Sequence, residues 1–207
     1  MRKVPTLFVR KYDVKPPILV PELTPGCEWV LAGEGTPTRK WDGTATLFKD
    51  GILWKRYEMK KDKKPPEGWV PAQEVDLLTG NCPGWIPIGT GPEDADMKEA
   101  YEAMFMGQLM EGVTYEYCGP KVNGNPEHLT VRAFIRHGMH TISDQRLKAS
   151  TVEELFTNVK SFLAETEIEG VVWHHAQGHM AKIKRRDFSL PWPIKLLEEQ
   201  YVQTANG

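Results

Sequence analysis

Four short segments place lysines and acidic residues at spacings that could serve one chemical site. Each segment looks like a β-strand or the end of one, and side chains alternate between the two faces of a strand. Charged residues two positions apart therefore share a face, while the residue between them points to the other side. The segments are KWDG at 40–43, TYEYC at 114–118, EGVVW at 169–173 and KIK at 182–184.

The charged residues of these segments raise the question of whether Lys40 is a nucleophile. A lysine attacks only as the neutral amine, and a free lysine, with a pKa of about 10.4, is protonated at pH 7. Neighbouring cations lower such a pKa. Carboxylates supply the oxygen ligands that Mg²⁺ prefers. The candidate residues, which could line one cleft on a sheet, are Lys40, Asp42, Glu116, Glu169, Lys182 and Lys184.

Taken singly, each segment has a more ordinary interpretation. A lysine before a hairpin is usually solvated, and a glutamate that begins a strand is usually an edge residue. The run KIKRR at 182–186 would be an exposed basic strand. The order of all four segments along one chain is what favours a shared site over chance.

The elements that must position these residues are mostly strands. Residues 44–48 and 52–57 flank Asp50 and Gly51, and an Asp-Gly pair between apolar runs predicts a hairpin. Further segments alternate in the manner of strands, namely 113–119, 128–138, 169–173 and 181–186.

Two helices are predicted among these strands. The first runs over about 93–108, and the second over 152–164 with apolar residues on one face. The second follows a capping box formed by Ser150 and Glu153 or by Thr151 and Glu154. Because strands outnumber helices and hairpin spacing favours antiparallel pairing, the predicted class is α+β, with antiparallel β-sheets flanked by helices.

Composition limits the possible functions only loosely. The 207 residues, 40% hydrophobic and 26% charged, suit one large domain or two small ones. A net charge of −2 gives no general attraction to nucleic acid, so such a partner would need local basic patches, as at 54–64 and 182–186. Three cysteines without paired or metal-ligand spacing indicate a reducing compartment, which predicts a cytoplasmic protein. Pro5 and Arg10 leave the start without an apolar stretch long enough for a signal peptide or membrane span.

The four segments resemble, in order, motifs I, III, IV and V of the covalent nucleotidyltransferases, the family of ATP-dependent ligases and RNA capping enzymes. Within that family, YEYCGPKVNGNPEHL at 115–129 and the Pro-, Gly- and Trp-rich region 65–92 look most like small stand-alone RNA ligases related to the vertebrate RNA ligase. Ala45 stands where many DNA ligases and capping enzymes have arginine. The 23 residues after KIK are too few for the OB-fold domain of those enzymes.

The resemblance implies an ATP-dependent RNA ligase that joins 5′-phosphate and 3′-hydroxyl RNA ends. It implies a single nucleotidyltransferase domain over residues 1–207, with an ATP-grasp-like ligase core and no OB domain. Lys40 would carry AMP during the reaction, and the cofactors would be ATP and Mg²⁺ or Mn²⁺. The alternatives are a minimal DNA ligase, a non-catalytic nucleic-acid-binding module with the same fold and, least favoured, a capping guanylyltransferase.

The resemblance also assigns roles to individual residues. Lys182 and Lys184 would hold the α-phosphate, and Asp42 would orient the amine or a metal-bound water. Glu169 would bind the metal, and Glu116 would either bind metal or hold the ribose hydroxyl. The full nucleotide-binding set is Arg39, Lys40, Glu116, Phe134, His137, Lys182 and Lys184, with Phe134 or His137 over the adenine and Phe134 otherwise a core residue.

Contacts to the polynucleotide are expected from the strand and loop after the hairpin turn. Arg56 resembles the arginine that meets the 5′-phosphate of the nucleic acid. A zinc site at His174, His175 and His179 is disfavoured, because no fourth ligand accompanies them. The predicted nucleic-acid-binding residues are Lys55, Arg56, Lys60, Lys61, Lys63 and Lys64.

Overall fold

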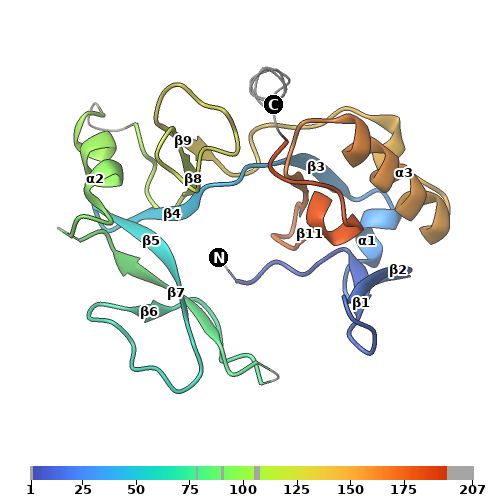
Figure 1. Ribbon diagram of the computed structural model, residues 1–207, viewed down its shortest axis with the longest axis horizontal. Coiled ribbons are helices and arrows are strands. Elements are labelled where there is room, and N and C mark those ends of the chain that lie inside the picture. Colours follow the sequence, from blue (N-terminus) through green and yellow to red (C-terminus); the bar gives the residue numbers. More distant parts are fainter. Residues whose placement is uncertain (1, 78, 90, 105–107, 195–207) are drawn as a thin grey trace, which may run out of the picture. The chain divides into compact units, whose positions relative to one another are not determined.

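The computed structural model describes residues 2–77, 79–89, 91–104 and 108–194. The class is α+β, as predicted, because its sheets are antiparallel and its helices are few. The chain divides into two compact units (Figure 1). One unit contains residues 5–40 and 140–207, and the other contains residues 1–4 and 41–139. The single nucleotidyltransferase domain stays a prediction.

A three-stranded sheet is the centre of the unit that contains residues 5–40. Its strand order is β11-β10-β3, with β10 paired antiparallel to both neighbours. The predicted strands at 169–173 and 181–186 correspond to β10 and β11. The elements of this unit are β1 (Phe8–Lys11), β2 (Ile18–Leu23), α1 (Glu28–Leu31), β3 (Gly35–Lys40), η1 (Gln145–Leu147), α3 (Val152–Glu165), β10 (Gly170–His175), β11 (Met180–Lys184) and η2 (Arg185–Phe188).

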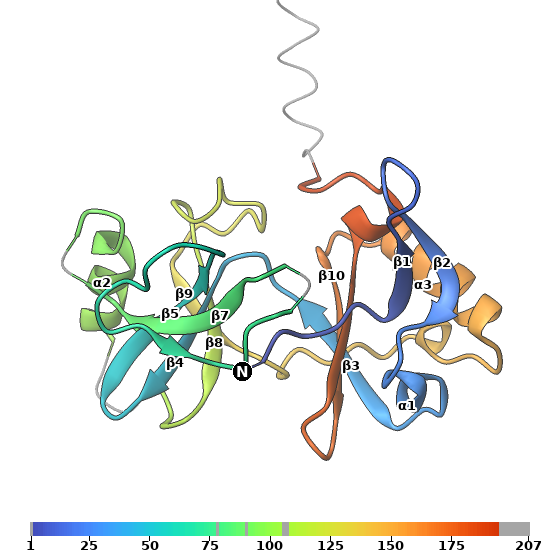
Figure 2. The ribbon, with the colours of Figure 1, turned by 90° about the horizontal axis from the view of Figure 1, so that it is seen from below.

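Helix α3 supplies much of the core of this unit. Thr151 caps it by accepting a hydrogen bond from the Glu154 amide, and the Glu154 side chain accepts from the Ser150 amide. Thr151 is therefore the cap, but the reciprocal bond of the predicted Thr151/Glu154 box goes to Ser150 instead; the helix prediction is confirmed to within one residue. The β1–β2 hairpin and α3 lie on the same side of the sheet (Figure 2). Buried residues from α3 and the sheet are Leu155, Val159, Phe162, Leu163, Val171, Trp173, Ala181 and Ile183.

The other unit is built on a six-stranded antiparallel sheet of order β6-β7-β5-β4-β8-β9. The predicted hairpin is confirmed as β4–β5, and its turn residues Asp50 and Gly51 have φ of 55° and 70°. Two successive left-handed residues make the turn that matches the twist of paired strands. The elements are β4 (Thr44–Lys49), β5 (Ile52–Met59), β6 (Val70–Pro71), β7 (Cys82–Pro87), α2 (Ala95–Glu102), β8 (Thr114–Cys118) and β9 (Ala133–Arg136).

Three predicted elements are too long. The helix predicted over 93–108 is α2, which starts at Ala95 and ends at Glu102. Residues 105–107 of the predicted range lie outside the described residues. The predicted strand 128–138 is limited to β9. Strand β11 stops at Lys184 because Arg185 turns inward, where its guanidinium donates to the carbonyl oxygens of Leu163 and Pro191.

The burial of Arg185 corrects one prediction about charge. Arg185 is only 4% exposed, so the run at 182–186 is not an exposed basic strand.

Among the described residues, none of the helices is long and apolar enough to cross a bilayer.

Candidate active site

Lys40 ends strand β3, and its amine donates a hydrogen bond to Oε2 of Glu169. Glu169 is 5% exposed, and its other oxygen, Oε1, lies 3.7 Å from the Lys184 amine. A buried carboxylate is stable only when it is paired, and here two lysines pair it. The predicted neighbours Lys40, Glu169 and Lys184 are thus brought together within one unit.

Strand register explains how Lys40 and Lys184 come to flank the residue that follows Glu169. Gly170 of β10 is directly opposite Lys40 on β3 and Lys184 on β11. Residues directly opposite in antiparallel strands point to the same face. A Cβ atom at Gly170 would lie 2.1 Å from the carbonyl oxygen of Ile183, so this position requires glycine. Gly170 lets β11 approach β10 closely at the residue that directly follows Glu169.

Lys182 lies two residues before Lys184 on β11 and belongs to the same group. It shares a face with Lys184, while Ile183 between them is fully buried, as predicted. Burial, together with the nearby charges of Lys40 and Lys184, lowers the pKa of Lys182 to about 8, whereas Glu169 and Asp187 act in the opposite direction. Three lysines around one buried glutamate leave an excess of positive charge, which suits phosphate.

The N-terminal segment holds the backbone of Lys182, a contact that the sequence did not reveal. The Lys182 amide donates to the Pro5 carbonyl over 2.9 Å, and its carbonyl accepts from the Leu7 amide over 2.7 Å. Thr6 forms a parallel bridge with Lys182 between these two bonds. No local pattern around residue 6 indicates this pairing.

Asp42 does not extend the strand that carries Lys40. Strand β3 ends at Lys40 and β4 begins at Thr44, so the alternation that would place both residues on one face does not apply. Lys40 and Asp42 also belong to different compact units. The prediction of one sheet beneath all six charged residues is therefore wrong, because Glu116 belongs to the six-stranded sheet.

Glu116 accepts hydrogen bonds within its own unit. Its Oε1 accepts from the Gly43 amide over 3.0 Å, and its Oε2 lies 2.9 Å from Nε2 of His137. Gly43 approaches β8 so closely that a Cβ atom there would be 2.2 Å from the Tyr117 carbonyl oxygen. The glycine of KWDG therefore has a steric reason, and Glu116 holds the amide of that same glycine.

The two candidate rings for adenine are both engaged with protein. His137 uses Nε2 on Glu116 and Nδ1 on the Thr114 hydroxyl, which lies 2.9 Å away. Phe134 packs against Tyr117 with ring centroids 4.8 Å apart and lies against the apolar cluster of this unit. The alternative interpretation of Phe134 as a core residue agrees with the structure, and His137 acts as a partner of Glu116.

Two predicted contact residues point into protein. Arg39 is opposite Val171, a core residue, and so lies on the other face of β3 from Lys40. Lys55 forms an ion pair with Asp94, whose side chain is 4% exposed. The structure thus separates Arg39 from Lys40 by strand face and pairs Lys55 with a buried carboxylate, while their binding roles stay predictions.

The remaining basic residues of the 54–64 region are better placed for a polyanion. The guanidinium of Arg56 lies 5.2 Å from the centre of the Trp85 ring, and burial lowers its pKa. Lys60 forms an exposed ion pair with Glu58. The exposed lysines after β5 are Lys60, Lys61, Lys63 and Lys64.

The histidine group has partners other than a metal. Nε2 of His175 lies 3.1 Å from Glu34, and its ring stacks on His179 with centroids 5.5 Å apart. Among the described residues, no group of three or more His, Cys, Asp and Glu side chains could hold a metal ion.

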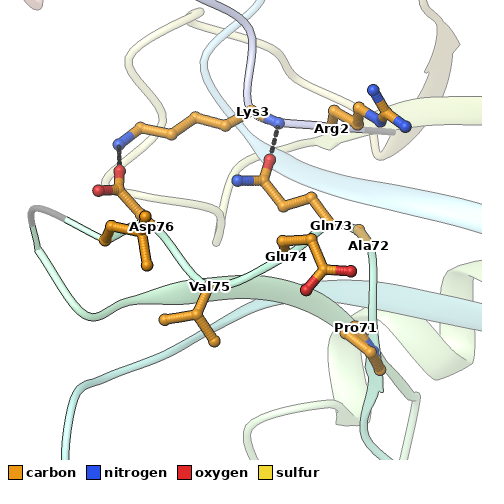
Figure 3. A pocket seen from close by; sticks show the side chains of 9 residues that line it. Arg2, Lys3, Pro71, Ala72, Gln73, Glu74, Val75 and Asp76 are labelled. Atoms are coloured by element: carbon orange, nitrogen blue, oxygen red, sulfur yellow. Dashed lines mark hydrogen bonds and ion pairs between the residues drawn. The ribbon is translucent and has the colours of Figure 1, made fainter.

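The unit of the six-stranded sheet has an open pocket of about 800 Å³ (Figure 3). It is lined by Arg2, Lys3 and residues 71–77 of the six-stranded-sheet unit. Lys3 crosses it, with its amide donating to Gln73 over 2.6 Å and its amine to Asp76 over 3.3 Å. None of the predicted catalytic or binding residues lines this pocket, although residues 71–77 belong to the Pro-, Gly- and Trp-rich region 65–92.

Comparisons with known proteins place the chain in a family. The family model of RNA ligase 1 matches residues 91–204, more than half of the chain. The chain belongs to the RNA ligase 1 family. The matched region includes Glu116, Glu169, Lys182 and Lys184, whereas Lys40 precedes it.

Curated relatives agree with the family assignment. RNA ligase 1 of Pongo abelii is 28% identical over 76% of this chain and 68% of that protein. The Mus musculus protein is 27% identical over 67% of this chain and 52% of its own length. The Danio rerio protein is 28% identical over 70% and 54%, respectively. The chain thus spans about half the length of the mouse and zebrafish proteins.

Proposed function

We propose that the protein is an ATP-dependent RNA ligase that joins a 5′-phosphate to a 3′-hydroxyl through AMP carried on Lys40. The observation that carries the proposal is the contact of the Lys40 amine with buried Glu169, beside Lys182 and Lys184. The RNA ligase 1 relatives support RNA as the polynucleotide.

The proposed reaction has three steps. The neutral amine of Lys40 attacks the α-phosphorus of ATP; a P–N bond forms, the bond to the bridging oxygen breaks and pyrophosphate leaves. An oxygen of the RNA 5′-phosphate then attacks the same phosphorus, breaking the P–N bond and returning the lysine. The 3′-hydroxyl finally attacks the 5′-phosphate, loses its proton and displaces AMP.

The lysines around Glu169 would perform most of this work by position and charge. Lys182 and Lys184 would hold the α-phosphate and offset the negative charge that builds up during transfer. Glu169 would hold the Lys40 amine in place, since its Oε2 already accepts from that amine. Asp42, two residues further on, would orient the attacking group.

The donor set fits a magnesium or manganese ion in one particular mode. Mg²⁺ usually binds one or two protein carboxylates together with substrate phosphates and waters. Glu169 would supply that carboxylate, and the ion when bound would polarise the phosphate oxygens. Glu116, which accepts from the Gly43 amide and pairs with His137, would either contact the ribose hydroxyl or add a second carboxylate.

Polynucleotide contacts are proposed for Arg56 and for the four exposed lysines at 60–64. Arg56 is held against Trp85 and presents a fixed cation, whereas the loop lysines are long, exposed and suited to phosphates. We also propose a cytoplasmic location, because the three cysteines are buried and none of them forms a disulfide.

Sealing of a nick with an RNA or a DNA 3′-hydroxyl end tests this function against its alternatives. We expect sealing when that end is RNA, and adenylylated 5′ ends accumulating when it is DNA, because the 2′-hydroxyl is the group that distinguishes them. Equal sealing of both would favour a DNA ligase. Binding without any sealing or adenylylation would favour a non-catalytic module.

A further inference from the structure

The turn between β3 and β4 has backbone groups that no strand satisfies. Residues 41–43 lie after Lys40 and before Thr44, outside both strands. The turn is half-buried, and its polar backbone groups are satisfied by water or by side chains. At Asp42 and Gly43 the partners come from three residues of the same unit.

The three partners bind the turn from β8 and the loop after it. Oε1 of Glu127 accepts from the Asp42 amide over 2.7 Å, as Glu116 does from the next amide, that of Gly43. Nδ2 of Asn123 donates to the Gly43 carbonyl over 2.9 Å and lies 3.4 Å from Oδ1 of Asp42. The loop therefore forms hydrogen bonds with both the backbone amide and the carboxylate of Asp42.

The loop that carries Asn123 and Glu127 is itself tightly built. Asn123, Asn125 and His128 have φ of 50°, 56° and 52°, a left-handed conformation that asparagine tolerates best among residues other than glycine. The Asn125 amide group and Leu129 backbone exchange two hydrogen bonds, of 3.1 and 2.9 Å. Such backbone persists only where surrounding contacts over-determine it.

We infer that Asn123 and Glu127 are positioning residues that fix the Asp42–Gly43 turn for transfer of AMP to Lys40. They do not touch the reacting atoms; they hold the backbone that directly follows Lys40 and orient the Asp42 carboxylate. The inference rests on the proposed function. A small displacement of such a turn can cost about 100-fold in rate, because transfer depends on alignment.

The chain offers a matched control for Glu127. Oε1 of Glu111 accepts from the Asp50 amide, also over 2.7 Å, at the β4–β5 turn of the same unit. Loss of either carboxylate removes one bond between a glutamate and a turn amide. Of these two bonds, only that of Glu127 is made to a residue of KWDG. Comparison of Glu127→Ala with Glu111→Ala therefore separates an effect of positioning from a general loss of stability.

The first readout is the single-turnover rate of Lys40 adenylylation. Glu127→Ala should lower it by about 10- to 100-fold with KM for ATP nearly unchanged. Glu127→Gln should recover most of the rate, because its amide oxygen still accepts, and Glu111→Ala should match the wild type. Asn123→Asp, which cannot donate, should fall with Glu127→Ala. A wild-type rate in Glu127→Ala, no recovery in Glu127→Gln, or an equal loss in Glu111→Ala would overturn the inference.

The second readout does not need activity. Amide hydrogen exchange should accelerate at Asp42 in Glu127→Ala and at Asp50 in Glu111→Ala, each without the other. Unchanged exchange at Asp42 would overturn the inference. A wild-type protein that gains no AMP at all would instead count against the proposed function, whereas the exchange result tests separately whether Glu127 holds the Asp42 amide.

Discussion

The two compact units use buried glutamates in different ways. Glu169 is 5% exposed and Glu116 is 9% exposed, so both are removed from water. Glu169 is paired by ammonium groups of Lys40 and Lys184, whereas Glu116 accepts from a backbone amide and pairs with an imidazole. The same side chain thus serves as the centre of an ion cluster in one unit and as a hydrogen-bond acceptor in the other.

The lysines follow the same division. In the unit of the three-stranded sheet they gather on one sheet face, where burial lowers the pKa of Lys182. In the unit of the six-stranded sheet, the lysines at 60–64 stay exposed in a loop. Burial strengthens electrostatic interactions and exposure weakens them. We therefore expect chemistry on phosphate to depend on the first group and polynucleotide binding on the second.

The largest effect is expected at Glu169. Glu169→Gln keeps the shape but leaves the lysines without a countercharge, so adenylylation should fall by about 1,000-fold or more. Removing one partner of a buried ion pair costs about 3–5 kcal/mol, so the variant should also melt earlier. Rates and melting curves check both effects, and a near-normal rate would make Glu169 a structural residue only.

Glu116 should show a smaller loss of a different kind. Glu116→Ala removes the acceptor of the Gly43 amide and the proposed ribose contact, so we expect about a tenfold loss in kcat/KM. Because no cluster of cations is left unpaired, its stability should change less than that of Glu169→Gln. Steady-state kinetics with ATP would measure the loss. An effect as large as that of Glu169→Gln would erase the proposed difference between the two glutamates.

Lys182 gives the cluster a pH dependence. Its pKa of about 8 lies below the ordinary 10.5, so between these values the folded chain has released a proton that the unfolded chain keeps. Stability should therefore rise with pH across this window relative to Lys182→Met, which has no such proton.

The same titration should appear in the kinetics. Wild-type kcat/KM for ATP should fall on the alkaline side near pH 8 as Lys182 loses its charge. In Lys182→Arg, which stays charged, that fall should move to higher pH. Identical pH profiles of kcat/KM for the two proteins would show that Lys182 does not hold the nucleotide.

The exposed lysines should give the smallest effect, limited to the steps that use RNA. Lys63→Glu/Lys64→Glu should weaken RNA end-joining several-fold and flatten its salt dependence, because each lost phosphate contact removes about 0.7 from the slope for single strands. Adenylylation of Lys40 should not change. Lys148→Glu/Lys160→Glu, exposed in the other unit, is the matched control. An equal loss of RNA end-joining in the control would show that the effect comes from the change in net charge and not from contacts of Lys63 and Lys64.

Local patterns predicted the parts of the site that lie within one strand. Alternation around Ile183 correctly placed Lys182 and Lys184 together, and the Asp50-Gly51 pair correctly marked a hairpin. Alternation failed at Asp42, because the strand ends at Lys40 and the chain passes there into the other unit.

Contacts between residues distant in sequence could not be predicted in this way. Glu127 binds an amide 85 residues away, and Lys55 pairs with Asp94, which directly precedes α2. Neither contact is accompanied by a periodic residue pattern from which it could be predicted. The NGNPEH segment at 123–128 held the only signal, since asparagine and glycine favour the left-handed backbone found there.

The most direct test of the account is the mass of the protein after incubation with ATP and Mg²⁺, followed by mapping of the modified peptide. We expect the gain of one AMP on Lys40 through an acid-labile phosphoramidate. Lys40→Arg, which keeps the positive charge beside Glu169 but offers no neutral amine, should gain nothing. No gain in the wild type, AMP on another residue, or equal labelling of Lys40→Arg would contradict the account.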